Sequence, residues 1–131
     1  MRAAAGMLSA AVLLSPGCDS PAPSRQADAD EPVRRASFRS LAARDFLISC
    51  PSGAGRAETA REAARLAELR GLAVRKGAGR AVVLGENDWA GMSRYADREA
   101  CEPGEAAFGE ALAAYSGTLD ELAGRIADYR P

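Results

Sequence analysis

The feature that most constrains the fold lies at the C-terminus, where large apolar residues recur at alternating intervals of four and three. They are Phe108, Leu112, Tyr115, Leu119, Leu122, Ile126 and Tyr129. This spacing places them along one face of an α-helix. Ser116 and Gly117 interrupt the segment, but the apolar stripe keeps its phase across them. We therefore predict one helix over residues 104–129 that packs its stripe against sister helices, with a coiled-coil seam as the alternative.

Residues 56–76 predict a second helix with two contrasting faces. Charged residues share one face, which we expect to be solvated: Glu58, Arg61, Glu62, Arg65 and Glu68. Small or short residues share the other: Ala60, Ala63, Ala64, Ala67, Gly71 and Val74. Such a smooth face predicts close packing on a neighbouring helix. The leucines at 66, 69 and 72 lie outside it, so the helix would touch two neighbours or leave an apolar edge exposed.

Two short apolar segments, residues 38–49 and 80–87, have no decisive period and fit either helix or a short buried strand. Two isolated parallel strands would leave their faces and edges poorly protected. We therefore predict a mainly α fold, a small helical domain with a long C-terminal helix after a disordered tether. The alternative is an α+β fold with short strands near 45–49 and 81–85.

Composition excludes several classes of function. The chain has 131 residues, enough for one small domain, and its formal net charge of -1 comes from interspersed acids and bases. It lacks the broad basic face that nucleic-acid binding requires, so we expect no such partner. The absence of histidine removes the usual general base and the commonest transition-metal ligand. The three cysteines are too far apart for a zinc cluster, and we expect no metal and no cofactor.

The N-terminus has the layout of a secretory signal. Arg2 precedes an apolar run from Ala3 to Leu14, which is too short to span a bilayer as a permanent helix. The following Gly17-Cys18 resembles the end of a bacterial lipoprotein signal, although Ser15 and Pro16 depart from the usual pattern. The resemblance implies removal of residues 1–17 and acylation of Cys18, with palmitate as one such acyl chain. Cleavage by ordinary signal peptidase, or no cleavage at all, are the alternatives.

The same resemblance implies a location on the periplasmic side of a bacterial cell envelope. Several acyl chains would anchor the chain stably to a membrane. Asp19 directly after the cysteine favours the inner membrane. Residues 18–36 are rich in proline and acids and poor in large apolar groups, so we predict a flexible tether. Residues 37–131 would then form the helical domain.

The segment CPSGAGR, from Cys50 to Arg56, carries the sharpest chemical candidate. A cysteine, five residues and an arginine resemble the anion-binding loop of cysteine phosphatases and, more loosely, of rhodaneses. The resemblance implies a Cys50 nucleophile and an Arg56 anion ligand. Ala57 replaces the usual Ser or Thr, and the upstream sequence is too short for the multistranded sheet of the phosphatases. Compositional bias toward Gly and Arg also accounts for the pattern.

A structural disulfide is the competing interpretation of Cys50. If acylation consumes Cys18, Cys50 and Cys101 are the only thiols left, and export would place them where thiols oxidise. Both lie at expected element boundaries. We therefore predict a Cys50–Cys101 disulfide.

The segment GENDW suggests a second binding candidate. Asn87 or Asp88 is expected to cap a short helix that contains the only tryptophan. Glu86 and Asp88 are a candidate carboxylate pair, but they are too few for a calcium site. A groove for a ligand beside Trp89, Met92 and Tyr95 is the functional interpretation.

Three functions therefore follow from the sequence. The favoured one is a lipid-anchored envelope protein whose helical domain binds another protein or supports an assembly without catalysis. The alternatives are a small-ligand binding module around Trp89 and a cysteine-dependent enzyme that uses Cys50 and Arg56.

Overall fold

The computed structural model describes residues 23–97 and 99–131. Within them lie α2 (Pro23–Ser49), the 3-10 turn η1 (Gly53–Gly55), α3 (Ala57–Arg75), α4 (Gly79–Met92) and α5 (Glu105–Ala127). No strand occurs among the described residues, so the prediction of a mainly α fold is confirmed. Residues 45–49 belong to α2 and residues 81–85 to α4, so the α+β alternative is wrong. The expected signal segment and Cys18 lie outside the described residues.

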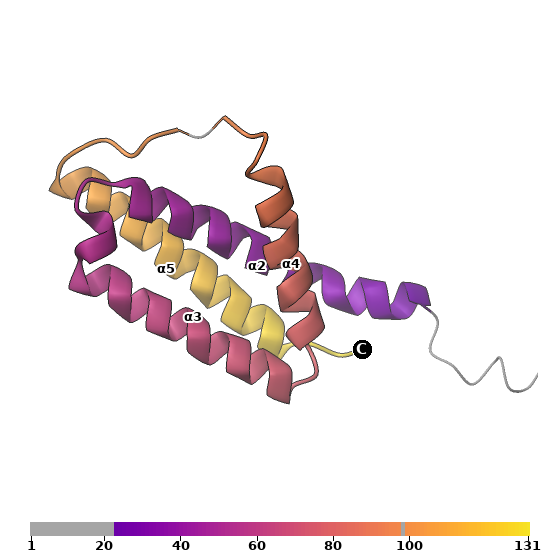
Figure 1. Cartoon of the computed structure of the whole chain (residues 1–131). Coiled ribbons are helices and arrows are strands. Elements are labelled where there is room, and N and C mark those ends of the chain that lie inside the picture. Colours follow the sequence, from indigo (N-terminus) through magenta and orange to yellow (C-terminus); the bar gives the residue numbers. More distant parts are fainter. Residues whose placement is uncertain (1–22, 98) are drawn as a thin grey trace, which may run out of the picture.

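Three long helices run side by side and the fourth crosses them. In Figure 1, α5 lies between α2 and α3, while α4 crosses α2 at a steep angle. α4 crosses α2 closely because Gly85 has no side chain: a Cβ there would lie 2.2 Å from the backbone oxygen of Arg34. The chain returns from α4 to the start of α5 through an irregular connection, described for residues 93–97 and 99–104, which runs above α2 in Figure 1.

The C-terminal stripe forms the centre of the core. α5 continues unbroken through Ser116 and Gly117, so the single-helix prediction is confirmed. The side chains with no exposed surface include Leu47 of α2 and four of the stripe: Tyr115, Leu119, Leu122 and Ile126. Each buried leucine or isoleucine contributes about 1.5–3 kcal/mol.

The helical domain begins earlier in the chain than residue 37, the predicted start, because residues 23–36 are helical and do not form a flexible tether. Val33 and Ala36 have no exposed surface. Proline at position 32 removes one helical hydrogen bond. Contacts with distant elements offset that loss: the Tyr129 hydroxyl donates to Asp30 at 2.7 Å and accepts from Gln26 at 2.7 Å. Composition could not reveal these contacts, because their partners lie about a hundred residues away in the chain.

The helix predicted over residues 56–76 is confirmed, but its buried face is not the predicted one. Leu66, Leu69 and Ala73 are buried, whereas the alanines of the small-residue face are exposed. Val74 on that face keeps 69% of its surface exposed. Burying a leucine removes more apolar surface from water than burying an alanine, so the leucines determine the orientation.

The predicted helix cap at Asn87 or Asp88 is also wrong. α4 begins at Gly79 and runs through both positions to Met92.

Candidate functional site

The two candidate cysteines form a structural bond. Cys50 and Cys101 are joined by a disulfide, with Cα atoms 4.7 Å apart and Cys50 only 3% exposed. A sulfur in a disulfide is not a thiolate, so this state of Cys50 has no nucleophile for phosphoryl or sulfur transfer.

The backbone after Cys50 is not arranged as an anion cradle. The Gly53 amide donates to the carbonyl of Cys50 at 2.8 Å, and the Arg56 amide donates to the carbonyl of Gly53 at 3.3 Å. The Gly55 amide is likewise used, by the carbonyl of Ser52. These N–H groups close the η1 turn instead of converging on a ligand.

Arg56 has a structural role as well. Its guanidinium donates to both carboxylate oxygens of Glu105, at 2.9 and 3.1 Å, and lies 4.1 Å from the ring centre of Phe108. The hydrogen bonds raise the pKa of Arg56 and lower that of Glu105. Arg56 thus links the start of α3 to the start of α5, and its guanidinium is engaged with a carboxylate of the chain itself.

Glu86 and Asp88 point to different neighbours and form no carboxylate pair. Glu86 accepts from Arg70 of α3 at 2.6 Å, and Asp88 accepts from Arg34 of α2 at 2.6 and 2.8 Å. The bond from Arg34 lowers the pKa of Asp88. Among the described residues, no group of three or more potential ligand residues surrounds a metal position. Both carboxylates hold α4 in place.

The predicted grouping of Trp89, Met92 and Tyr95 is not observed. Trp89 is half-buried, edge-on to Phe38 at 5.5 Å, and its indole N–H donates to Asp45 at 2.6 Å. Met92 is 55% and Tyr95 87% exposed. Neither lines the cavity beside Trp89, so only Trp89 of the predicted group belongs to it.

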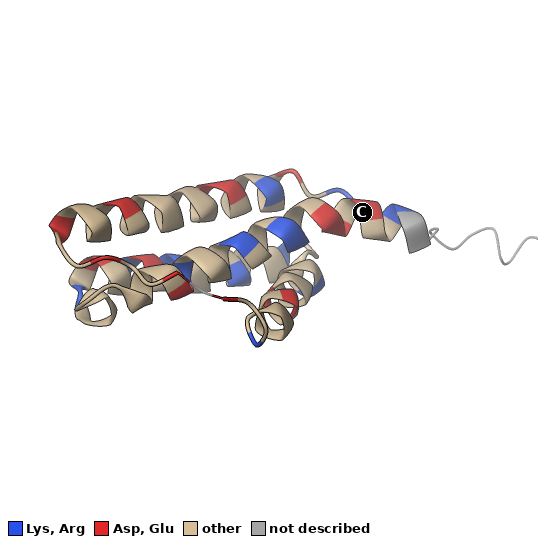
Figure 2. Ribbon diagram, turned by 90° about the horizontal axis from the view of Figure 1, so that it is seen from above, with Lys and Arg blue, Asp and Glu red and all other residues tan. Residues whose placement is uncertain are grey.

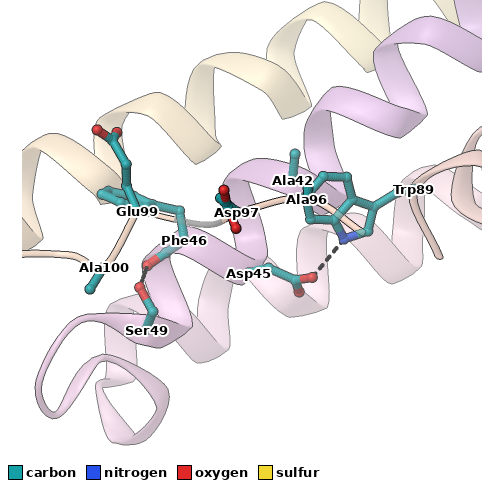
Figure 3. A pocket seen from close by; sticks show the side chains of 9 residues that line it. All are labelled: Ala42, Asp45, Phe46, Ser49, Trp89, Ala96, Asp97, Glu99 and Ala100. Carbon is teal, nitrogen blue, oxygen red and sulfur yellow. Dashed lines mark hydrogen bonds between the residues drawn. The ribbon is translucent and has the colours of Figure 1, made fainter. Parts of the chain in front are cut away.

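That cavity, here the Trp89 hollow, has a volume of about 530 Å³. It lies between the second half of α2 and the chain that follows α4. Figure 3 shows Phe46 and Trp89 at its two ends, with Asp45 and Asp97 between them in this view. Its lining residues are Ala42, Asp45, Phe46, Ser49, Trp89, Ala96, Asp97, Glu99 and Ala100.

A second cavity adjoins the first and shares Phe46, Glu99 and Ala100 with it. This cavity, here the Cys101 hollow, has a volume of about 620 Å³ and reaches the first half of α5. Its other lining residues are Cys101, Glu102, Ala107, Glu110, Ala111 and Ala114. The two hollows share Phe46, which is 38% exposed, and we call the two adjoining hollows, across α2 and α5, the trough.

The connection from α4 to α5 forms a shared wall of this trough. We call this connection, residues 93–97 and 99–104, the strap. The disulfide attaches the strap to the end of α2 through Cys101, whose amide also donates to the Ser49 hydroxyl at 3.3 Å. The sequence predicted that the two cysteines pair, but it did not show that their bond holds the strap close to Phe46.

Among the described residues, the charged side chains that line the trough are all acidic. Figure 2 marks acidic residues on either side of the grey position in the strap. Among the described residues, no Lys or Arg lines either hollow. Arg94 of the strap lines neither hollow, and Arg98 lies outside the described residues. The carboxylates that line the trough are Asp45, Asp97, Glu99, Glu102 and Glu110.

Asp45 differs from the other carboxylates because it already accepts from Trp89 and lies 3.4 Å from Arg44. Within the part of the chain that the structure describes, the other four have no ion-pair partner. The acidic run of the strap was a visible sequence signal. Its position beside Phe46 was not visible, because the two segments are about fifty residues apart in the chain.

Comparison with protein-family models, curated proteins and solved structures gives no match for this chain. Across the described residues, no helix combines the length and hydropathy needed to cross a bilayer.

Proposed function

We propose that this chain is an exported, lipid-anchored protein of the bacterial cell envelope whose helical domain binds another protein without catalysis. The trough of two adjoining hollows carries the binding part of the proposal. It presents aromatic and alanine surface within an acidic rim. Exposed concave apolar surface is typical of binding sites.

The signal-like N-terminus and the disulfide support export. Disulfides persist in oxidising compartments such as the periplasm and are rare in the cytosol. Pairing Cys50 with Cys101 leaves Cys18 as the remaining cysteine, at the position that resembles an acylation site. Asp19 after it favours retention at the inner membrane, on its periplasmic side.

The distance from the anchor to the trough suits a partner in the periplasm. From Cys18 to the start of α2 at Pro23 the chain can span at most about 17 Å, so the N-terminal end of α2 would stay close to the bilayer. Phe46 lies roughly 35 Å further along the helix. An anchored domain therefore has enough length to present the trough away from the lipid headgroups.

The anchor is tested by the mass and location of the native protein. We expect a chain that begins at Cys18 and carries acyl mass, and that fractionates with membranes. Cys18→Ala should release it into the soluble periplasmic fraction, whereas Ser20→Ala, two residues away, should remain bound. A native species without acyl mass, or a membrane-bound Cys18→Ala variant, contradicts the anchor.

Protein binding is tested by crosslinking in intact cells. A photoreactive amino acid at position 100 lies in the wall of both hollows, whereas the same amino acid at position 67 lies on the exposed face of α3. We expect one discrete protein adduct from position 100 and none from position 67. Absence of an adduct from position 100 contradicts the proposal.

A small-ligand site around Trp89 is the second candidate. The Trp89 hollow alone has a volume of about 530 Å³, within the usual range for ligand sites. Because Trp89 is the only tryptophan, its fluorescence reports directly on this hollow. A metabolite extract of the periplasm that shifts this fluorescence after proteins have been removed would support this candidate.

A further inference from the structure

We propose that the Trp89 and Cys101 hollows together form one docking site for a basic, amphipathic segment of the partner protein. This inference rests on the proposed function and specifies the chemistry of the partner. In the docked segment, apolar side chains would enter the hollows on both sides of Phe46. Its Lys and Arg side chains would lie against the carboxylates of the rim.

The shape of the trough favours an extended partner over a compact molecule. The two hollows have volumes of about 530 and 620 Å³ and meet at Phe46 and Ala100. A small ligand would fill one hollow and leave the other empty. A peptide segment with apolar residues along one side can occupy both, as helices do in hydrophobic grooves.

The charge of the trough determines which segment fits. Asp97, Glu99 and Glu102 are exposed on the strap, and none has an ion-pair partner among the described residues. Glu110 extends the acidic rim along α5. Like charges on one surface repel an acidic partner and attract a basic one, which increases both specificity and the rate of association.

Segments of this chain itself fit the trough poorly. Residues 1–22 contain one basic residue, Arg2, so they lack the complementary charge. A second copy would have to offer basic surface, but many arginines of the domain are already engaged in ion pairs: Arg34, Arg35, Arg39, Arg56, Arg65 and Arg70. A different protein with a basic segment is therefore the occupant that we infer.

The disulfide would make the site sensitive to redox conditions. Cys101 fixes the strap against the end of α2, and the strap supplies most of the carboxylates. Without the bond the carboxylates lose their fixed position over the hollows, and a binding surface that must be ordered on association binds more weakly.

The test uses a defined peptide and the fluorescence of Trp89. The probe is a tryptophan-free peptide of about 14 residues, with Leu on one helical face and Lys on the other. One control peptide has Glu in place of every Lys, and a second has the same composition in an order without a Leu face. We expect saturable binding of the first peptide only, weakened by added salt because surface charges are screened.

Matched protein variants locate the binding. The first carries Asp97→Asn, Glu99→Gln and Glu102→Gln in the strap. The control variant makes the same change of net charge away from the trough and carries Asp28→Asn, Glu68→Gln and Asp128→Asn. These three carboxylates are exposed and have no ion-pair partner within residues 23–97 and 99–131. Loss of one exposed ion pair weakens binding about twofold to fivefold. Because the strap variant loses three carboxylates, we expect its affinity for the peptide to fall at least about tenfold. The control should bind as the wild type does, apart from general screening effects.

The double variant Cys50→Ala/Cys101→Ala should remain helical by circular dichroism and bind the peptide about fivefold weaker. The docking site is overturned if the Lys peptide fails to bind, if the Glu peptide binds equally well, or if the strap and control variants lose the same affinity. It is also overturned if spermidine alone reproduces the Trp89 shift at equal concentration, or if the chain self-associates through the strap in sedimentation.

These outcomes separate the inference from the proposed function. If position 100 gives an adduct in cells but the Lys peptide does not bind, the basic partner is refuted while the proposed protein binding is still supported. Strap-dependent peptide binding without any adduct in cells refutes the proposed function and supports the chemistry of the surface.

Discussion

Removal of the Cys50–Cys101 bond should destabilise the domain strongly. The size of the loss in unfolding free energy follows from the number of residues in the loop that the bond closes. The cysteines are 51 residues apart. In the chain-entropy model, closing a loop of this length lowers the entropy of the unfolded chain enough to stabilise the fold by about 4 kcal/mol at 25 °C. Small domains have a total stability of about 5–15 kcal/mol, so Cys50→Ala/Cys101→Ala should still fold but with a small margin.

The assay is urea unfolding followed by the fluorescence of Trp89, the only tryptophan. With a denaturant slope of about 1.5 kcal/mol per molar, a loss of 4 kcal/mol lowers the midpoint by about 2–3 M. Wild type in reducing agent is the control, because it loses the bond and keeps both sulfur atoms. It should unfold at nearly the midpoint of the double variant.

Two results would refute this reasoning. A double variant that loses less than about 1 kcal/mol would show that the closed loop is already restricted in the unfolded chain. A wild-type midpoint that does not respond to reduction, together with free thiols in non-reducing peptide maps, would show that the bond does not form in the native protein.

Three further outcomes are expected for other parts of the fold. Gly85→Ala should lower the free energy of unfolding by about 1–3 kcal/mol in a thermal unfolding assay, because its Cβ would lie 2.2 Å from a backbone oxygen of α2. The control Gly117→Ala has open space and should raise the free energy of unfolding by about 0.5–1 kcal/mol in the same assay. Equal effects of the two substitutions would contradict the close crossing of α4 and α2. Tyr115→Phe should be neutral or stabilising in urea, because the buried hydroxyl has no hydrogen-bond partner among the described residues; a loss above about 1 kcal/mol would show a partner. Arg34 lowers the pKa of Asp88, so the ion pair stabilises the fold above the ordinary aspartate pKa of about 4, and this stabilisation is lost as pH falls through the lower pKa of the folded state. The difference in unfolding free energy between wild type and Asp88→Asn should therefore narrow in acid. A difference that stays constant with pH would refute the pairing.

Local sequence patterns determined much of the helical architecture. The spacing from Phe108 to Ile126 predicted both the length of α5 and its buried face, since large apolar side chains at one helical face have no better place than a core. The cysteine count, combined with the signal-like N-terminus, predicted the pairing of Cys50 and Cys101. Each of these inferences needed information from one segment or from the composition of the whole chain.

Patterns failed where neighbouring elements decide the outcome. Residues 23–36 have the composition of a tether, but α4 and the C-terminus cover their few apolar side chains and engage Asp30 and Arg34. In α3, two faces each carried apolar residues, and the leucine face was selected because it removes more surface from water. A helical pattern shows that a face is apolar, but it does not show which face packs against another helix.

The candidate site belongs almost entirely to the tertiary structure. Trp89 was identified from the sequence, while Phe46, Asp97 and Glu99 became part of the same surface only through the crossing of α2 and the path of the strap. The sequence by itself determined the helices over residues 57–75 and 105–127 and which cysteines remain to pair. The tertiary structure alone decided where a trough opens and which charges surround it, because surface relief arises between elements whose residues are far apart along the chain.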